Sequence, residues 1–139
     1  MAALVLFDVF PYDLAKKIHN FDADTIKLAL TNTAPNTATN AVIADITQIS
    51  AGSGYTTGGE ATTSLGLNNG PPTTWSCSGA EFAASGGSIG PFRYVVFYNS
   101  TASGGPLIGY TDYGMALSIP DGSTFNVAVV GATLTIENV

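Results

Sequence analysis

The chain is poor in the side chains on which most enzymes and metalloproteins depend. Its 139 residues include one cysteine, one histidine and four lysines and arginines together, against ten aspartates and glutamates. A single cysteine excludes an intramolecular disulfide framework and is typical of proteins that fold in a reducing compartment. A single histidine excludes any site built from two or more histidines. The composition favours a protein that is not an enzyme and that needs no metal or cofactor.

The small number of basic residues also restricts the partners that the chain can bind. Its formal net charge is −6. Nucleic-acid binding needs a basic stripe that displaces counterions from phosphates, and Lys16, Lys17, Lys27 and Arg93 are too few to form one. No apolar run is long enough to cross a bilayer, and a basic membrane-binding face is absent. We therefore expect neither a nucleic acid nor a membrane as partner.

Charged residues of both signs are scarce, at 10% of the chain, whereas hydrophobic residues make up 45%. Soluble domains usually carry about 25% charged residues. The surface of this protein is therefore covered by Ser, Thr, Asn and Gly, or part of it is buried against another chain. The composition leaves both alternatives open.

The N-terminal segment, residues 1–11, is apolar and superficially similar to a signal peptide. It has no basic start, Asp8 interrupts its short hydrophobic stretch, and no clean cleavage site follows. We expect this segment to be retained as an apolar arm, followed by a single domain over residues 12–139.

The remaining sequence predicts one short helix followed by strands. Leu14, Ala15 and Ile18 share one face of a helix expected over residues 12–20. After it, short alternating segments such as TIKLALT, PLIGYTDYG and STFNVAVV are bounded by Gly, Pro, Asp or Asn. About eight strands at this spacing predict an all-β fold, an antiparallel β-sandwich of jelly-roll or immunoglobulin-like type.

The stretch GPFRYVVFYNS, residues 90–100, holds the only arginine of the chain. Strict alternation would place Phe92, Tyr94, Val96 and Tyr98 on one face and Arg93, Val95, Phe97 and Asn99 on the other. Both faces are largely apolar, as in a central strand of a sandwich. One face would cover the core, and the other would be covered by a loop, by the N-terminal helix or by a neighbouring subunit.

No group of residues in the sequence forms a convincing catalytic or metal site. His19 is expected to be solvated at the helix end, and Cys77, in a strand pattern beside Trp75, to be a buried small hydrophobe. Asp22 and Asp24 resemble the start of a calcium loop, but the required glycine and glutamate are missing. The sequence therefore indicates no catalytic residues that would act together with Arg93. We expect it to pair with a carboxylate or with a neighbouring subunit.

The order of several motifs resembles a widespread group of virion structural proteins of tailed bacteriophages. FDADTIKLAL matches their D-T-x-K-V-x-L strand, and GYTTGG at residues 54–59 matches their G-Y-T-x-G-G turn. RYVVFYNST at residues 93–101 and the following TDYG match their R-Y-x-x-x-Y-x-x-T strand and D-x-G segment. The likeness covers about residues 12–130, whereas MAALVLFDVFP has no counterpart in the pattern.

The resemblance implies a structural role, commonly as a decoration or cement protein on the surface of the phage head. It implies the major capsid protein as partner, trimers at local three-fold positions, and assembly in the cytoplasm of a bacterial host. A tail or fibre-associated component of the same virion is an alternative. The residues expected at an interface are Leu4, Leu6, Phe7 and Phe10 of the arm, and Arg93.

A second alternative is a carbohydrate-binding β-sandwich module. Such a module would use Trp75, Tyr110 and Tyr113 as platforms on which sugar rings stack.

Overall fold

The computed structural model describes residues 4–127 and 134–137, and within them the fold is all-β. One α-helix, α1 (Phe10–Ala15), and one 3-10 helix, η1 (Ile43–Asp45), accompany ten strands in these residues. The strands are β1 (Val5–Leu6), β2 (Ile26–Thr31), β3 (Glu60–Ala61), β4 (Thr63–Asn68), β5 (Thr73–Ser78), β6 (Glu81–Ala83), β7 (Ile89–Asn99), β8 (Leu107–Ile119), β9 (Thr124–Asn126) and β10 (Leu134–Ile136).

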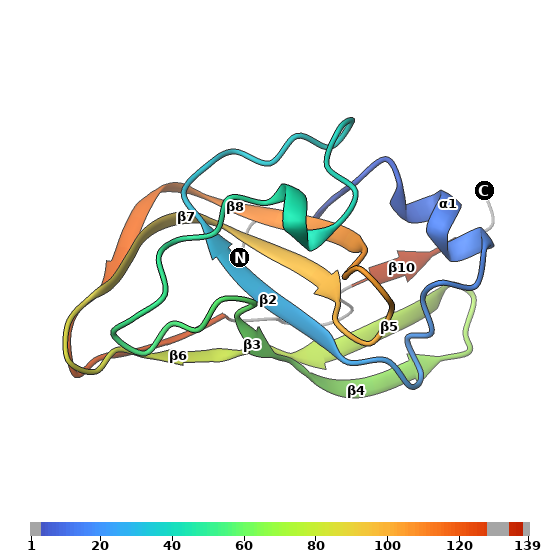
Figure 1. Ribbon diagram of the computed structural model, residues 1–139. Coiled ribbons are helices and arrows are strands. Elements are labelled where there is room, and N and C mark those ends of the chain that lie inside the picture. The colour runs from blue at the N-terminus through green and yellow to red at the C-terminus, as the bar shows by residue number, and fades with distance from the viewer. Residues whose placement is uncertain (1–3, 128–133, 138–139) are drawn as a thin grey trace.

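The strands form an antiparallel sandwich, which confirms the predicted fold class. The main sheet has the order β1-β8-β7-β2-β3, and the facing layer consists of the sheet β10-β5-β4 and the pair β6-β9. Figure 1 shows β4, β5 and β6 in the lower layer, with β2, β7 and β8 above them. The described residues form ten strands, whereas about eight were expected. Two of the ten, β1 and β3, are only two residues long and are too short to be recognised in the sequence.

The main core lies between the two layers. Leu28, Val95 and Phe97 enter it from the main sheet, and Trp75 and Phe82 enter it from the facing layer. Side chains of this size that are removed from water each stabilise the fold by about 1.5–3 kcal/mol.

A second, smaller cluster covers the outer face of the main sheet. Val96 and Tyr98 of β7 pack there with Leu107, Phe7 and Ile46. Ile46 belongs to the connection between β2 and β3, and Phe7 to the N-terminal segment. The outer face that the sequence left without a cover is therefore covered by the chain's own loop and N-terminal residues.

The alternation predicted for residues 90–100 is wrong at Phe92. Phe92 lies in the main core together with Val95 and Phe97, not on the side of Val96 and Tyr98. The reason is a shift in the pairing of β7 with β8. Phe92 pairs with Leu117 but Tyr94 pairs with Asp112, so residues 113–116 stand opposite Arg93 alone. An irregularity of this kind breaks the period of two and redirects the side chains on either side of it.

The helix also differs from the expected range of residues 12–20. It begins at Phe10, with Pro11 in the first turn, where a missing backbone N–H costs nothing. It ends before Lys17, whose φ of 64° is left-handed and cannot continue the helix.

Residues 4–10 do not form an arm separate from the domain. Val5 and Leu6 pair with Tyr110 and Gly109 of β8, and the backbone N–H of Phe7 donates to the carbonyl oxygen of Ile108 over 3.1 Å. Phe7 and Phe10 are 0% and 3% exposed. Residues 1–3 of the predicted arm, and 128–133 and 138–139 of the predicted domain, lie outside the described residues.

Candidate functional site

Arg93 of β7 forms a two-pronged ion pair with Asp112 of β8 at the surface of the molecule. Its Nε donates to Oδ1 over 2.8 Å, and one terminal nitrogen donates to Oδ2 over 3.0 Å. The two side chains are 40% and 37% exposed. The hydrogen bonds from Arg93 hold the pKa of Asp112 below its ordinary value. The prediction that Arg93 pairs with a carboxylate is therefore confirmed, and the carboxylate belongs to its own chain.

The irregular pairing of β7 and β8 places this ion pair. Asp112 is the partner of Tyr94 in the ladder, next to Arg93 in sequence. The Oδ1 of Asp112 also accepts a hydrogen bond from the backbone N–H of Gly114 over 2.7 Å. Gly114 has a φ of 81°, which favours glycine. Asp112 thus shapes the extra segment of β8 and orients the guanidinium group at the same time.

A row of aromatic rings leads from the ion pair to the N-terminal segment. The guanidinium carbon of Arg93 lies 5.3 Å from the centroid of the Tyr94 ring. Tyr94 contacts Tyr110 at 5.9 Å between centroids, and Tyr110 contacts Phe7 at 5.8 Å. Val5, which pairs with Tyr110, is 42% exposed. We call Arg93, Asp112, Tyr110 and Val5 the Arg93 surface; Tyr94, which is 9% exposed, is buried next to it.

The five residues expected at an interface are only partly brought together. Phe7 is linked to Arg93 through the aromatic row, but it is buried and offers no surface. Leu4 packs against the main core, and Phe10 lies within it. Leu6 is 38% exposed at the edge of the sheet. Exposed Leu6 and half-exposed Arg93 remain available for a contact, whereas Phe7 and Phe10 are core residues.

His19 is buried, not solvated as the sequence suggested. It is 6% exposed, and its ring packs against Phe10 and Phe21 at 5.2 and 5.9 Å between centroids. Burial lowers the pKa of His19 from 6.5, and the nearby carboxylates of Asp13 and Asp24 offset part of this effect. The sequence period could not reveal this burial, because His19 follows the end of the helix.

A short polar chain joins His19 to Asp24 inside this cluster. The side-chain nitrogen of Asn99 donates to Oδ2 of Asp24 over 2.6 Å and lies 3.3 Å from Nδ1 of His19. The side-chain nitrogen of Asn99 can only donate, so Nδ1 is the acceptor in this contact. An amide between the two groups holds them in place but is a poor proton relay. The arrangement holds the loop before β2, where Oδ2 of Asp24 also accepts a hydrogen bond from the backbone N–H of Asn20 over 2.9 Å.

Several other candidate residues are buried in the core. Cys77 is 1% exposed, as expected, and Trp75 is 3% exposed. The indole N–H of Trp75 donates to Oγ of Ser64 over 3.3 Å, and the ring lies 5.1 Å from that of Phe21. Trp75 is therefore not available to stack on a sugar. Tyr113 packs on Phe125 at 5.7 Å.

The motif positions of the phage resemblance meet in space around β2. Tyr55 of the glycine-rich turn accepts a hydrogen bond from the backbone N–H of Leu30 in β2 over 3.0 Å. Gly59 of the same turn approaches β2 so closely that an added Cβ would overlap the carbonyl oxygen of Leu28. Tyr98 of β7 donates to the carbonyl oxygen of Gly58 over 2.6 Å. These motif residues build the fold.

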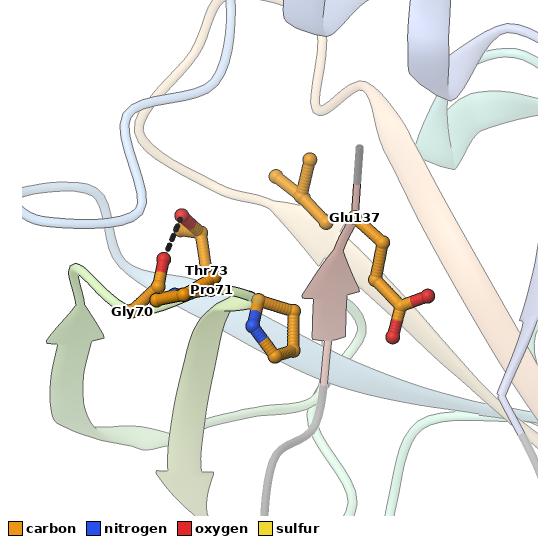
Figure 2. Close-up of a pocket in the computed structure, with 6 residues that line it drawn as sticks. Gly70, Pro71, Thr73 and Glu137 are labelled. Carbon is orange, nitrogen blue, oxygen red and sulfur yellow. Dashed lines mark hydrogen bonds between the residues drawn. The ribbon is translucent and has the colours of Figure 1, made fainter. Parts of the chain in front are cut away.

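Two adjoining hollows open at one end of the sandwich. One, of about 580 Å³, is lined by Gly70, Pro71, Pro72, Thr73, Ile136 and Glu137. Figure 2 shows Thr73 pointing toward the carbonyl oxygen of Gly70, with Glu137 on the other side of the hollow. The other hollow, of about 430 Å³, shares Thr73 and Ile136 and reaches His19, Phe21 and Leu67. Both are shallow and mainly apolar, and neither gathers groups for catalysis.

The described part of the chain contains no group of three or more His, Cys, Asp or Glu residues arranged to hold a metal ion. Within the same residues, no helix is long and apolar enough to cross a membrane.

Comparison of the chain with protein-family models, with curated proteins and with solved structures finds no match.

Proposed function

We propose that the protein is a virion structural protein of a tailed bacteriophage, a decoration protein that stabilises the head by bridging subunits of the major capsid protein. In this proposal it lies on the capsid surface and is assembled in the cytoplasm of the bacterial host. The resemblance of its motifs to such proteins is the origin of the proposal.

The observation that carries the proposal is the convergence of the motif positions in one sheet. The D-T-x-K strand, the G-Y-T-x-G-G turn and the R-Y strand lie far apart in the sequence. They nevertheless meet in β2, in the turn that packs on it, and in β7, through the contacts of Tyr55, Gly59 and Tyr98. Motif positions that contact one another in the fold support the resemblance more strongly than isolated matches would.

The Arg93 surface is the part of the main sheet best suited to contact a capsid subunit. It combines half-exposed Arg93 with partly exposed Tyr110, and these residue types are enriched at the centres of protein interfaces. Two nitrogens of Arg93 donate hydrogen bonds to Asp112. If a partner covers this pair, neither charge is buried without its counter-charge.

The location of the chain in the particle tests the proposed role directly. Virions of the encoding phage are purified, heads are separated from tails, and the chain is detected in each fraction by mass spectrometry. Detection in the heads supports the decoration role. Detection only in the tails favours the tail or fibre alternative, and absence from both fractions contradicts a virion role.

A second experiment tests the contact surface. Capsids that lack the protein are mixed with the purified chain and sedimented. We expect Arg93→Glu to bind at least tenfold more weakly than the wild type. Lys16→Glu makes the same charge change at an exposed position of the chain, outside the Arg93 surface, and serves as the control. Equal binding by the two variants would exclude the Arg93 surface as the contact.

A further inference from the structure

Strand β4 forms an open edge of the facing layer. It pairs with β5 on one side, and no other described strand pairs with its second side. All six of its residues are exposed. Figure 1 shows β4 at the lower rim of the molecule with no strand beyond it. An open edge presents backbone N–H and C=O groups that another strand can pair with.

This edge has few of the features that usually prevent strand pairing between chains. Edge strands are commonly protected by charged residues, above all lysine, or by proline. Residues 61–80 contain no charged residue, and the prolines of this stretch follow β4 instead of lying within it. The one irregularity is a shift in the pairing with β5 between Ser64 and Gly66, which leaves Leu65 as the extra residue.

Apolar side chains line the same edge. Leu65 is 67% exposed and Leu67 is 45% exposed. Between them, Gly66 has a φ of 120°, and an added Cβ would meet no atom within 4 Å. A glycine within a strand often marks a place where another backbone approaches closely. In the sequence, the uncharged stretch 61–80 is the signal for this edge.

The charge of the chain indicates which partner fits this edge. Each copy carries a net charge of −6, so two copies repel one another across most of their surfaces. The stretch that contains β4 adds no charge of its own to this repulsion. An uncharged apolar edge also holds no group that would select an oppositely charged partner.

The order of residues in β4 is self-complementary. Read outward from Gly66, each direction gives a leucine and then a small polar residue, Ser64 on one side and Asn68 on the other. In an antiparallel pair centred on Gly66, Leu65 of one copy would stand opposite Leu67 of the other. Ser64 would stand opposite Asn68. Apolar residues thus stand opposite apolar residues, and polar residues opposite polar ones. Such cross-strand pairs stabilise a sheet.

We propose that β4 pairs edge to edge with β4 of a second copy of this chain, antiparallel and around a two-fold axis. The sheet β10-β5-β4 of one copy then continues into the same sheet of the other copy across the contact. An antiparallel pair of identical strands closes after two copies, so this edge links the protein into dimers.

The mass of the protein in solution tests the proposal. Size-exclusion chromatography with light scattering is run over a hundredfold range of concentration. For the wild type we expect the mass of two chains. For Leu65→Lys we expect the mass of one chain. Met115→Lys is the matched control, because Met115 is 64% exposed in the extra segment of β8, and it should keep the double mass. Thr63→Lys adds a charge to the edge without removing an apolar side chain, and it should also give the mass of one chain.

Hydrogen exchange shows whether the backbone of β4 makes the contact. Amides of residues 63–68 should exchange more slowly in the wild type than in Leu65→Lys, while amides of β7 exchange equally in both. A wild-type mass of one chain, a mass of three chains, or a double mass that both β4 variants retain would overturn the proposal. The trimer implied by the phage resemblance is therefore distinguished from this two-fold contact in one experiment.

Discussion

The hydroxyl group of Tyr55 accepts a hydrogen bond from the backbone N–H of Leu30 over 3.0 Å and donates one to Oε1 of Gln48 over 2.7 Å. The same Gln48 oxygen accepts a hydrogen bond from the backbone N–H of Gly58 over 2.8 Å. One tyrosine thus connects β2, the connection that follows it, and the glycine-rich turn. Burial raises the pKa of Tyr55 to about 12, so the hydroxyl group keeps its proton at every ordinary pH.

Removing this hydroxyl group should destabilise the fold. In Tyr55→Phe the backbone N–H of Leu30 loses its acceptor in a buried environment, which costs about 1–3 kcal/mol. Urea unfolding monitored by circular dichroism measures the loss. Tyr12→Phe is the control, because Tyr12 is 63% exposed and should unfold as the wild type does. Equal stabilities of the two variants would mean that the hydrogen bond is not formed.

Truncation of Phe7 distinguishes a core residue from a residue of a detached arm. Phe7→Ala should lower the free energy of unfolding by about 3–5 kcal/mol, because it leaves a cavity on the outer face of the main sheet. Leu6→Ala, at a neighbouring position that is 38% exposed, should cost much less. Differential scanning calorimetry gives both values. A Phe7→Ala variant as stable as the wild type would restore the detached arm as the better description.

The turn glycine Gly59 should not tolerate a side chain. Gly59 and Gly122 have similar positive φ values of 71° and 81°, so alanine introduces similar backbone strain at both positions. Only at Gly59 would the new Cβ overlap the backbone of Leu28. Such overpacking lowers the free energy of unfolding by a further 1–3 kcal/mol, roughly. Gly59→Ala should therefore unfold at a clearly lower urea concentration than Gly122→Ala, and a reversed order would contradict the close approach to β2.

The buried imidazole of His19 should make stability depend on pH. The folded protein lowers the pKa of His19 below 6.5, so the unfolded chain takes up a proton at a higher pH than the folded one. By linkage, this contribution to stability is fully present above pH 6.5, approximately, and is lost as the pH falls toward the pKa of the folded state. Asp13 and Asp24, the charged groups that act on His19, reduce the size of the loss.

The variant His19→Gln isolates this contribution, since it removes the titrating group and leaves the carboxylates in place. Urea midpoints at about pH 7.5 and about pH 5.5 bracket the ordinary range of histidine. We expect a smaller decrease in the variant than in the wild type. The same decrease in both would show that other groups cause the pH dependence.

The alternation and turn signals of the sequence were enough to predict the fold class. They depend on local properties, because the period of a strand and the backbone freedom of glycine hold within any sheet. The burial of Cys77 and the pairing of Arg93 with a carboxylate could also be predicted from the sequence. The identity of Asp112 as that carboxylate did not, since Arg93 and Asp112 lie in different strands whose register is decided by pairing.

Errors arose where a single long-range contact overrides a local pattern. The extra residues 113–116 of β8 reverse the orientation expected for Phe92, and no feature within β7 signals this. The sequence predicts Phe7 and Phe10 at an interface, because an apolar N-terminus contains no information about which surface receives it. His19 is buried against Phe10 and Phe21, and Asn99, 80 positions away, also reaches its ring.

The sequence by itself determined that this is an acidic, charge-poor β-sandwich, because composition and local periodicity depend on no partner strand. Only the tertiary structure decided which apolar residues form the core and which stay at the surface. That choice depends on strand register and on which strand is left at the edge, and both are decided by contacts between distant segments. The exposure of β4 and the burial of Phe7 follow from those contacts.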